Sequence, residues 1–250
     1  MSGHSKWSSI KHKKAAVDAK KGKAFTQVAN LIAMTARKGG GDARMNFSLR
    51  LAIDKAKTVN MPTANIDRAI KRGTGEGGGS RIEEVVYEGY GPSGTAVLVE
   101  AATDNKNRTV SEVRAAFTKS GGSLGGAGSV VYLFNQKGQL TLSDKDQKLS
   151  KDERELAILD SGADDFEEIE DQIIIYTKPN KLATVKDNLE QAGAKIELAE
   201  LAFIPKTEVK ISDLEKAKSV LKLMDILERL DDVVAVHSNF DIDESLIENH

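Results

Sequence analysis

The sequence contains no cysteine in its 250 residues. The chain can therefore form no disulfide, no thiolate nucleophile and no cysteine-ligated zinc site, and this composition suits a reducing compartment. No stretch approaches the roughly 18 consecutive apolar residues that a membrane-spanning helix needs. The start, MSGHSKWSSIKHKK, lacks the apolar segment of a secretory signal. We expect a cytoplasmic protein that does not insert into a membrane.

Residues that could carry catalysis or hold a metal are also few. Within the expected helices, none of the four histidines stands at a metal-ligand spacing from another histidine or from a carboxylate. There is no thiol, no candidate Ser-His-Asp set and little aromatic lining, since aromatic residues make up 5% of the chain. The acidic pairs between Asp152 and Asp171 follow expected helix and strand surfaces, where charge runs are usually solvated. We predict a protein that is not an enzyme and that binds no metal and no cofactor.

Two glycine-rich stretches have the spelling of phosphate-binding motifs without their context. Gly89–Gly94 matches G-x-G-x-x-G, but it contains a proline and connects two strand-like segments, whereas a dinucleotide fingerprint must open a helix. Gly121–Gly128 has no Gly-Lys-Ser/Thr ending, so it is not a P-loop. We predict that the first is a tight hairpin turn and that the second is either a structural turn or a contact loop.

Charge is divided unevenly along the chain. Residues 1–72 contain 16 lysines and arginines against 4 acidic residues, a net charge of +12, whereas residues 73–250 contain 20 against 34, a net charge of −14. The total of −2 hides this division. A basic segment joined to an acidic body is typical of a domain that binds a polyanion, and a well-solvated basic bundle is the alternative.

The basic segment has the apolar periodicity of three helices, at 15–38, over a stripe from Leu49 to Val59, and at 63–72. A triple glycine ends the first helix, and a proline follows the second. On the third helix, Arg68 lies roughly 200° around the axis from the inward-facing Ile66. The sequence therefore predicts a strip of three cations on the outer face of this helix: Arg68, Lys71 and Arg72.

Strand and helix patterns alternate after a glycine-rich linker at 73–80. We expect a hairpin at 83–102, a helix at 109–120 opened by the capping box Thr109–Glu112, and a strand at 129–134. Segment 139–203 then has the order βαββαβ, with a capping box at Ser150–Glu153. A strand, a helix capped at Ser212–Glu215 and a last strand at 233–240 would complete a second βαββαβ unit across this insert.

The predicted fold class is therefore α+β and multidomain. A basic three-helix domain with its glycine-rich linker spans 1–80. A discontinuous ferredoxin-like α/β domain spans 81–135 plus 206–250, and a second ferredoxin-like α/β domain, at 136–205, is inserted into it.

The first helix and the segment before it carry the densest cation cluster. Lysine predominates over arginine there, which favours neutralising a phosphate backbone over reading guanine edges. Trp7 is suited to stacking on an unpaired base, or else to anchoring the tail on the bundle. The candidate contact residues in this cluster are Lys6, Trp7, Lys11, His12, Lys13, Lys14, Lys20, Lys21 and Lys23.

A second polar cluster, at 103–109, stands where a strand gives way to a helix. Its Asn and Asp residues are good turn and cap residues, which explains half of the cluster without any ligand. Two cations beside a helix N-terminus favour an anion, either a phosphate or an acidic group of a partner. The candidate contact residues are Asn105, Lys106, Asn107 and Arg108.

These same stretches closely resemble the YebC/PmpR family, which includes the mitochondrial translational activator of cytochrome c oxidase. The matches are GHSKWSSIKHKKAAVDAKKGKAF from Gly3, GGGDARMNFSLRLAIDKAK from Gly39, NMPTANIDRAIKRGTGE from Asn60, YEGYGPSGTAVLVEA from Tyr87 and TDNKNRTVSEVRAAF from Thr103. They cover most of residues 1–135. The chain departs from the family pattern at Ala43 and Phe47, where prolines are expected, and at Ala127, where an acidic residue is common.

The resemblance implies a helical N-terminal domain, two α/β domains with one inserted in the other, and a non-enzymatic cytoplasmic role. It implies either a DNA-binding transcriptional regulator or a ribosome-associated factor that binds ribosomal RNA and relieves stalling at proline-rich stretches. The residues predict a nucleic acid as the partner, and the resemblance implies that it is DNA or ribosomal RNA. The alternative is a protein-interaction adaptor, in which acidic α/β domains dock a partner and the basic domain confers solubility.

Overall fold

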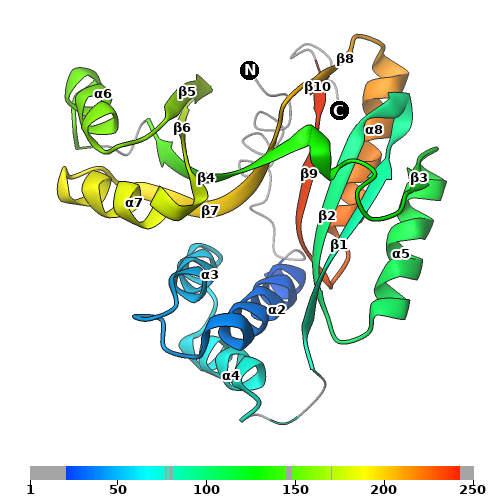
Figure 1. Cartoon of the computed structure of the whole chain (residues 1–250), viewed down its shortest axis with the longest axis horizontal. Helices are drawn as coiled ribbons and strands as arrows, with labels where there is room; N and C mark the ends of the chain where they lie inside the picture. Colours follow the sequence, from blue (N-terminus) through cyan, green and yellow to red (C-terminus); the bar gives the residue numbers. More distant parts are fainter. Residues whose placement is uncertain (1–20, 77, 79–80, 145–147, 170, 243–250) are drawn as a thin grey trace. The chain divides into compact units, whose positions relative to one another are not determined.

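The computed structural model describes residues 21–76, 78, 81–144, 148–169 and 171–242 (Figure 1). The chain separates into two compact units. The larger unit comprises Met1–Phe134 with Pro205–His250, and the inserted unit comprises Asn135–Ile204.

The larger unit begins with helices, as the sequence predicts. Because residues 1–20 lie outside the described chain, the first helix is seen only from Lys21 onward. Its last residue precedes Gly40, whose φ of 86° ends the helical path. Asn46 opens the next helix by accepting a hydrogen bond from the Leu49 amide. The helices are α2 (Lys21–Gly39), α3 (Phe47–Thr58) and α4 (Thr63–Thr74). Their shared core includes Val28, Ile32, Leu49, Ala52, Ala56, Ile66 and Ala69.

Helix α4 approaches the backbone of α2 very closely at Gly73. A Cβ atom on Gly73 would lie 2.2 Å from the Ala33 carbonyl oxygen. We expect Gly73→Ala to lower the free energy of unfolding by about 2 kcal/mol, because overpacking against rigid backbone outweighs the helix propensity of alanine, which is worth about 1 kcal/mol. Chemical denaturation would measure the loss. Gly126→Ala is the control, since a Cβ there meets nothing within 4 Å, and an unchanged midpoint for Gly73→Ala would contradict the prediction.

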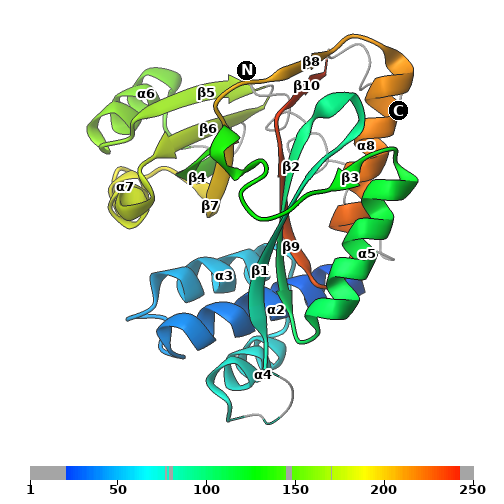
Figure 2. The same cartoon turned by 45° about the vertical axis from the view of Figure 1, so that its right-hand side comes forward.

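The larger unit continues with a four-stranded sheet in the order β3-β1-β2-β9. Helices α5 and α8 lie side by side on one face of this sheet (Figure 2). The core between them and the sheet includes Val97, Val99, Phe117 and Leu221. Helix α2 contacts the opposite face, where Ala33 and Met34 meet Ala102. The elements are β1 (Glu83–Tyr90), β2 (Ala96–Thr103), α5 (Lys106–Lys119), β3 (Ser123–Leu124), α8 (Leu214–Glu228) and β9 (Val233–Ser238).

The hairpin of β1 and β2 confirms the interpretation of the G-x-G-x-x-G spelling. The two strands pair antiparallel from Glu83 with Thr103 to Tyr90 with Ala96. The connecting turn, η2 (Pro92–Gly94), includes Ser93 with a φ of 60°. The spelling therefore marks a turn between strands and not the start of a helix.

The strands beyond the hairpin differ from the predicted second βαββαβ unit. The prediction of a strand at 129–134 was wrong. The short strand β3 lies earlier, within the glycine-rich stretch, and the 3-10 turn η3 (Val131–Leu133) follows it. The backbone amides of Val130 and Val131 donate to the Glu88 carboxylate, so they cannot join a strand ladder. Strand β8 (Val209–Ile211) pairs in parallel with β10 (Phe240–Ile242) as a separate sheet, and β1 takes the place between β2 and β3.

The inserted unit has the predicted ferredoxin-like order. Its sheet runs β5-β6-β4-β7, so the first and third strands of the βαββαβ unit are central. The core includes Leu140, Leu142, Ile173, Leu182 and Leu189. The capping box at Ser150–Glu153 is confirmed. The elements are β4 (Phe134–Ser143), α6 (Lys151–Asp160), β5 (Asp165–Ile169), β6 (Gln172–Thr177), η4 (Pro179–Lys181), α7 (Leu182–Gln191) and β7 (Ile196–Pro205).

Two of the predicted helix caps were wrong. Helix α5 begins at Lys106 and is capped by Asn105, whose side chain accepts from the Arg108 amide, so Thr109 lies inside the helix. Helix α8 is capped by Asp213 in place of Ser212. In both cases an Asx residue close to the predicted serine or threonine takes the cap position, and Asx residues are equally good caps.

Candidate nucleic-acid interface

Part of the predicted contact set lies outside the described residues. It comprises Lys6, Trp7, Lys11, His12, Lys13, Lys14 and Lys20. Lys21 begins helix α2, but only its backbone is described. For these residues the role in nucleic-acid contact stays a prediction.

The structure divides the predicted three-cation strip of α4. Arg68 and Lys71 are exposed, whereas Arg72 is half-buried and its Nη2 donates to Asn30 Oδ1 on α2 at 2.6 Å. Burial lowers the pKa of Arg72, and the charge of Asp104 acts in the opposite direction. The close approach at Gly73 explains the difference, because it draws the neighbouring Arg72 against α2. The outward strip therefore consists of Arg68 and Lys71.

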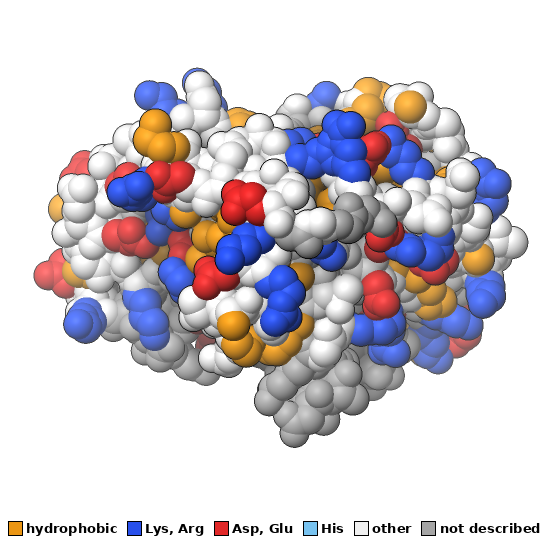
Figure 3. Space-filling model, turned by 90° about the horizontal axis from the view of Figure 1, so that it is seen from below, with side chains coloured by type: hydrophobic (Ala, Val, Ile, Leu, Met, Phe, Trp, Pro, Cys, Tyr) orange, Lys and Arg blue, Asp and Glu red, His pale blue; other side chains and the backbone are white. Residues whose placement is uncertain are grey.

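These two cations differ from most others on the helical region. Arg68 donates to the neutral Asn65 side chain at 3.3 Å. Neither Arg68 nor Lys71 forms an ion pair within the described chain. In contrast, ion pairs join Lys38 to Glu84, Arg44 to Asp42 and Lys57 to Asp54. Figure 3 likewise shows lysine and arginine side chains in separate groups with acidic ones among them on one face of the molecule.

Lys23 has an intramolecular role at the end of helix α8. Its Nζ donates to the Arg229 carbonyl at 2.6 Å. One turn along α2, Gln27 Nε2 donates to the carbonyls of Glu228 at 2.6 Å and Leu230 at 2.9 Å. The last carbonyls of a helix lack partners within it and carry partial negative charge. Helix α2 therefore caps α8, and Lys23 is engaged by the protein itself.

Asp232 lies at the centre of the polar contacts beside this cap. Its side chain is buried, at 7% exposure. Oδ2 accepts hydrogen bonds from Thr109 Oγ1 at 2.6 Å, Arg108 Nη2 at 2.7 Å and Thr103 Oγ1 at 3.0 Å. Arg108 also contacts Asp104 at 3.1 Å. These bonds fix the N-terminal turn of α5 to the start of β9.

The pKa of Asp232 is lowered by this arrangement. Burial alone would raise it, but the hydrogen bonds from Thr109, Arg108 and Thr103 outweigh burial. The bond with Asp232 in turn raises the pKa of Arg108. The pair is therefore charged at neutral pH and is already satisfied within the protein.

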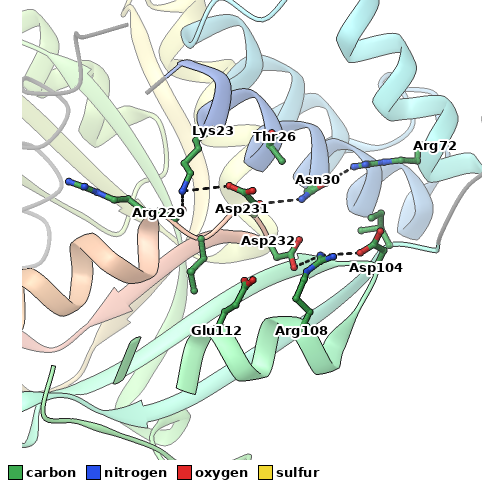
Figure 4. Close-up of a pocket in the computed structure, with 12 residues that line it drawn as sticks. Lys23, Thr26, Asn30, Arg72, Asp104, Arg108, Glu112, Arg229, Asp231 and Asp232 are labelled. Carbon is green, nitrogen blue, oxygen red and sulfur yellow. Dashed lines mark hydrogen bonds and ion pairs between the residues drawn. The ribbon is translucent and has the colours of Figure 1, made fainter. Parts of the chain in front are cut away.

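A pocket of about 450 Å³ opens where α2, α4, α5 and the α8–β9 connection meet (Figure 4). Arg108 and Asp232 point toward each other across its floor, and Asn30 points toward Arg72. Four basic and four acidic side chains are among its lining residues, so the charges balance. This balance gives the pocket no preference for an anion. The charged residues are Lys23, Arg72, Arg108, Arg229, Asp104, Glu112, Asp231 and Asp232.

The predicted cluster at the start of α5 lines a second pocket of about 410 Å³. Asn105 forms the helix cap, with Oδ1 accepting from the Arg108 amide at 3.1 Å. Lys106 Nζ lies 2.5 Å from a Glu83 carboxylate oxygen and lowers the pKa of Glu83 through this bond. Asn107 is exposed. Local structure thus accounts for Asn105, Lys106 and Arg108, and phosphate contact by this cluster stays a prediction.

Sequence reasoning missed two buried carboxylates that organise their surroundings: Asp232 at the first pocket, and Glu88 at the loop that follows β3. Glu88 accepts from the amides of Gly128 at 2.6 Å, Val130 at 2.8 Å and Val131 at 2.9 Å. Burial raises its pKa, and these backbone hydrogen bonds lower it by more. Glu88 alternates with apolar neighbours as an exposed strand residue would, so the sequence carries no signal for its burial.

The described residues can be compared with the requirements of a metal site and of a membrane-spanning helix. In residues 21–242, apart from the gaps given above, no group of three histidine or acidic side chains could hold a metal ion. His237 Nε2 lies 2.6 Å from Glu100 Oε1 on the neighbouring strand. Of the helices described, none is long and apolar enough to cross a membrane.

Comparison with known proteins covers nearly the whole chain. Residues 5–76 match the TACO1/YebC protein N-terminal domain, and residues 82–240 match the TACO1/YebC second and third domain. A "probable transcriptional regulatory protein" of Persephonella marina is 53% identical over 99% of both chains. One from Trichlorobacter lovleyi is 52% identical over 97% of this chain and 96% of the relative.

A solved structure shares the fold as well. The crystal structure of a conserved hypothetical protein from Aquifex aeolicus aligns with a TM-score of 0.86 at 48% identity, over 92% of this chain and 94% of the other. The resemblance seen in the sequence motifs and the predicted helical and α/β regions are thereby confirmed. The chain belongs to the TACO1/YebC family.

Proposed function

We propose that this chain is a non-enzymatic, cytoplasmic regulator of gene expression that binds nucleic acid through its basic helical region. The observation that carries the proposal is the division of charge, with a net +12 in residues 1–72 and a net −14 in the remainder. Arg68 and Lys71 add two exposed cations on α4, and neither forms an ion pair within the described chain. Ammonium and guanidinium groups that replace counterions on phosphates give affinity without sequence specificity.

Two targets fit this chemistry, DNA and ribosomal RNA. The relatives' names, "probable transcriptional regulatory protein", support DNA. Lysine-rich contacts suit a phosphate backbone, and Trp7 suits an unpaired base, which supports ribosomal RNA and association with the ribosome. Sedimentation of a lysate through a sucrose gradient separates the two targets. Co-migration with ribosomes that is lost in high salt supports a translational role, and enrichment on promoter DNA supports a transcriptional one.

Charge reversal on α4 tests the proposed interface. We expect Arg68→Glu with Lys71→Glu to weaken binding to DNA or RNA about tenfold to a hundredfold at low salt, because two attractions become repulsions. Fluorescence anisotropy with a labelled oligonucleotide measures the change. The matched control, Lys178→Glu with Lys181→Glu, makes the same change in net charge at exposed positions of the inserted unit. If both double variants weakened nucleic-acid binding equally, the effect would be one of net charge, and this result would contradict the proposed interface on α4.

Arg72 is unsuitable for this test, although it belongs to the predicted set. Its guanidinium is half-buried against Asn30, so Arg72→Glu would place a carboxylate in the contact between α2 and α4. Loss of binding by that variant would report unfolding as well as lost phosphate contact.

A protein-interaction adaptor is the second candidate, supported by helix α6 of the inserted unit. Leu156 and Leu159 there are 59% and 69% exposed and lie three residues apart on one face. Residues 135–204 carry 9 basic and 16 acidic residues, a net charge of −7. An acidic, partly apolar surface suits a basic protein partner. If the adaptor role is the only one, charge reversal on α4 will leave cellular function unchanged.

A further inference from the structure

An aromatic surface stands beside the glycine-rich loop of the larger unit. Tyr132 is 59% exposed, Tyr90 37% and Val131 36%. Tyr90 ends strand β1, and the other two residues belong to the turn η3, more than 40 positions further along the chain. The structure thus brings together exposed rings in a protein whose aromatic content is only 5%. We refer to Tyr90, Val131 and Tyr132 as the tyrosine surface.

The loop that carries this surface is fixed in place by a buried charge. Glu88 is 7% exposed, and its carboxylate accepts the three amide hydrogen bonds from Gly128, Val130 and Val131 described above. The Gly125 amide donates to the Glu88 carbonyl at 2.7 Å. Charge-assisted bonds to a buried carboxylate are stronger than ordinary amide bonds. The loop, which crosses β1 and β2 in both views, is therefore a rigid support for the rings (Figure 2).

The hydroxyl group of Tyr90 is bonded within the protein. Tyr90 Oη donates to the Ser129 carbonyl at 3.0 Å. The neighbouring phenol of Tyr132 raises the pKa of Tyr90. A surface tyrosine usually keeps its ring inside and its hydroxyl in water. Here the hydroxyl of Tyr90 is held by the loop backbone while the rings of Tyr90 and Tyr132 remain exposed, so the site presents ring surface.

A lysine completes the site. Lys206 Nζ donates to the Tyr132 carbonyl at 2.8 Å, so the ammonium group of an exposed lysine lies at the backbone of the same residue and keeps two further N–H groups for a ligand. The carboxylate of Glu88 is buried beneath the loop, where it accepts hydrogen bonds from loop amides. A ring with an adjacent exposed cation suits a nucleotide with a free base face, since the ring stacks on the base and the cation neutralises the phosphate. A paired base inside a duplex offers no such face.

We propose that the tyrosine surface, with Lys206, binds unpaired nucleotides of single-stranded RNA by stacking. This inference rests on the proposed function and adds a second contact, on the α/β part of the larger unit, to the basic helical region. The helical region would supply affinity for any phosphate backbone. The tyrosine surface would supply the preference for unpaired over paired strands.

The test compares a labelled 15-nucleotide oligouridine RNA with an RNA duplex of the same length, using the full-length chain. We expect Tyr132→Ala to weaken binding of the single strand between about 5-fold and 150-fold, the usual range for losing one stacked base, and to leave duplex binding within about twofold. Tyr132→Phe should retain the affinity, because the ring remains. Leu214→Ala is the control, since it removes another exposed apolar side chain, 37% exposed, from the larger unit.

Each other outcome overturns the inference in a distinguishable way. Wild-type binding to both RNAs that Tyr132→Ala leaves unchanged would refute the tyrosine surface and leave the proposed function standing. Equal weakening on single strand and duplex would show a general structural effect in place of stacking. Unchanged RNA binding together with loss of a protein crosslink at position 132 would assign the rings to a protein partner. Absence of wild-type binding to any nucleic acid at low salt would refute the proposed function itself.

Discussion

Replacing Asp232 with alanine is expected to lower the free energy of unfolding by about 2–4 kcal/mol, among the largest losses that a single polar substitution produces. The reason is that removing the carboxylate leaves its hydrogen-bond donors without this acceptor. Thr103 and Thr109 are both buried, and they would lose their shared acceptor. Arg108 would keep only the contact with Asp104, at the protein surface. Because Arg108 is partly exposed, water compensates part of its loss, which places the estimate below that for a fully buried ion pair.

Denaturant unfolding of wild type and variant measures this loss. Asp231→Ala is the matched control, because Asp231 is the adjacent residue with an exposed side chain, 3.8 Å from Lys23. That exposed pair should contribute less than about 1 kcal/mol. If Asp232→Ala cost no more than Asp231→Ala, the network around α5 and β9 would not stabilise the fold as we infer.

The same substitution should change how stability depends on pH. The folded-state pKa of Asp232 is lowered, whereas an unfolded aspartate titrates near 3.9. A lowered folded pKa contributes stability that is fully present above the unfolded pKa and is lost as pH falls through the folded pKa. The stability difference between wild type and Asp232→Ala should therefore be constant from about pH 5 to 7 and shrink below about pH 4. A constant difference at all pH values would contradict the ionised state of Asp232.

The regular elements could be predicted because their signals are local. Apolar periodicity located α3 and α4 closely. The structure has the predicted βαββαβ order in the inserted unit, because each of its strands is bounded by clear turn or cap residues. The strand at 129–134 could not be excluded in this way. Its residues have strand propensity. However, the amides of Val130 and Val131 donate to the carboxylate of Glu88, which is more than 40 positions away in sequence.

The candidate site was predictable in composition and less so in geometry. Counting charges located the basic region, and helical angles placed Arg68 and Lys71 on the outside of α4. The same angles could not show that Gly73 lets α4 approach α2 so closely that Arg72 turns to Asn30. Likewise, nothing in the sequence indicates that Lys23 caps a helix some 200 positions away. Such contacts depend on which surfaces meet, and a single sequence does not specify this.

Binding to DNA or RNA should be strongly salt-dependent. If roughly five to eight phosphates are contacted, the logarithm of the association constant should fall with the logarithm of salt concentration at a slope of about −4 to −7. Affinity would then drop by about 10² to 10⁴ between 50 and 200 mM salt. Titrations by fluorescence anisotropy at several salt concentrations give the slope. An affinity that hardly changed over this range would refute phosphate neutralisation as the basis of binding.

The exposed cations of the described helices can supply only part of that slope. A cation that already pairs with a carboxylate releases few counterions, and Lys38, Arg44 and Lys57 are paired in this way. Arg68 and Lys71 alone would give a slope of only about −2. We expect the remainder to come mainly from the five lysines in residues 1–20. Their replacement by glutamine should make the slope shallower by about 3 to 5. The five lysines are Lys6, Lys11, Lys13, Lys14 and Lys20.

The matched control removes five exposed lysines from the rest of the chain: Lys148, Lys178, Lys181, Lys195 and Lys210. Both variants carry the same net charge, so a general electrostatic attraction would alter their slopes equally. Direct phosphate contact predicts a shallow slope only for the N-terminal variant, because counterion release counts phosphates that are touched and not the charge of the whole protein. A steep slope in the N-terminal variant would shift the contact to other cations and refute the assignment to the basic N-terminal segment.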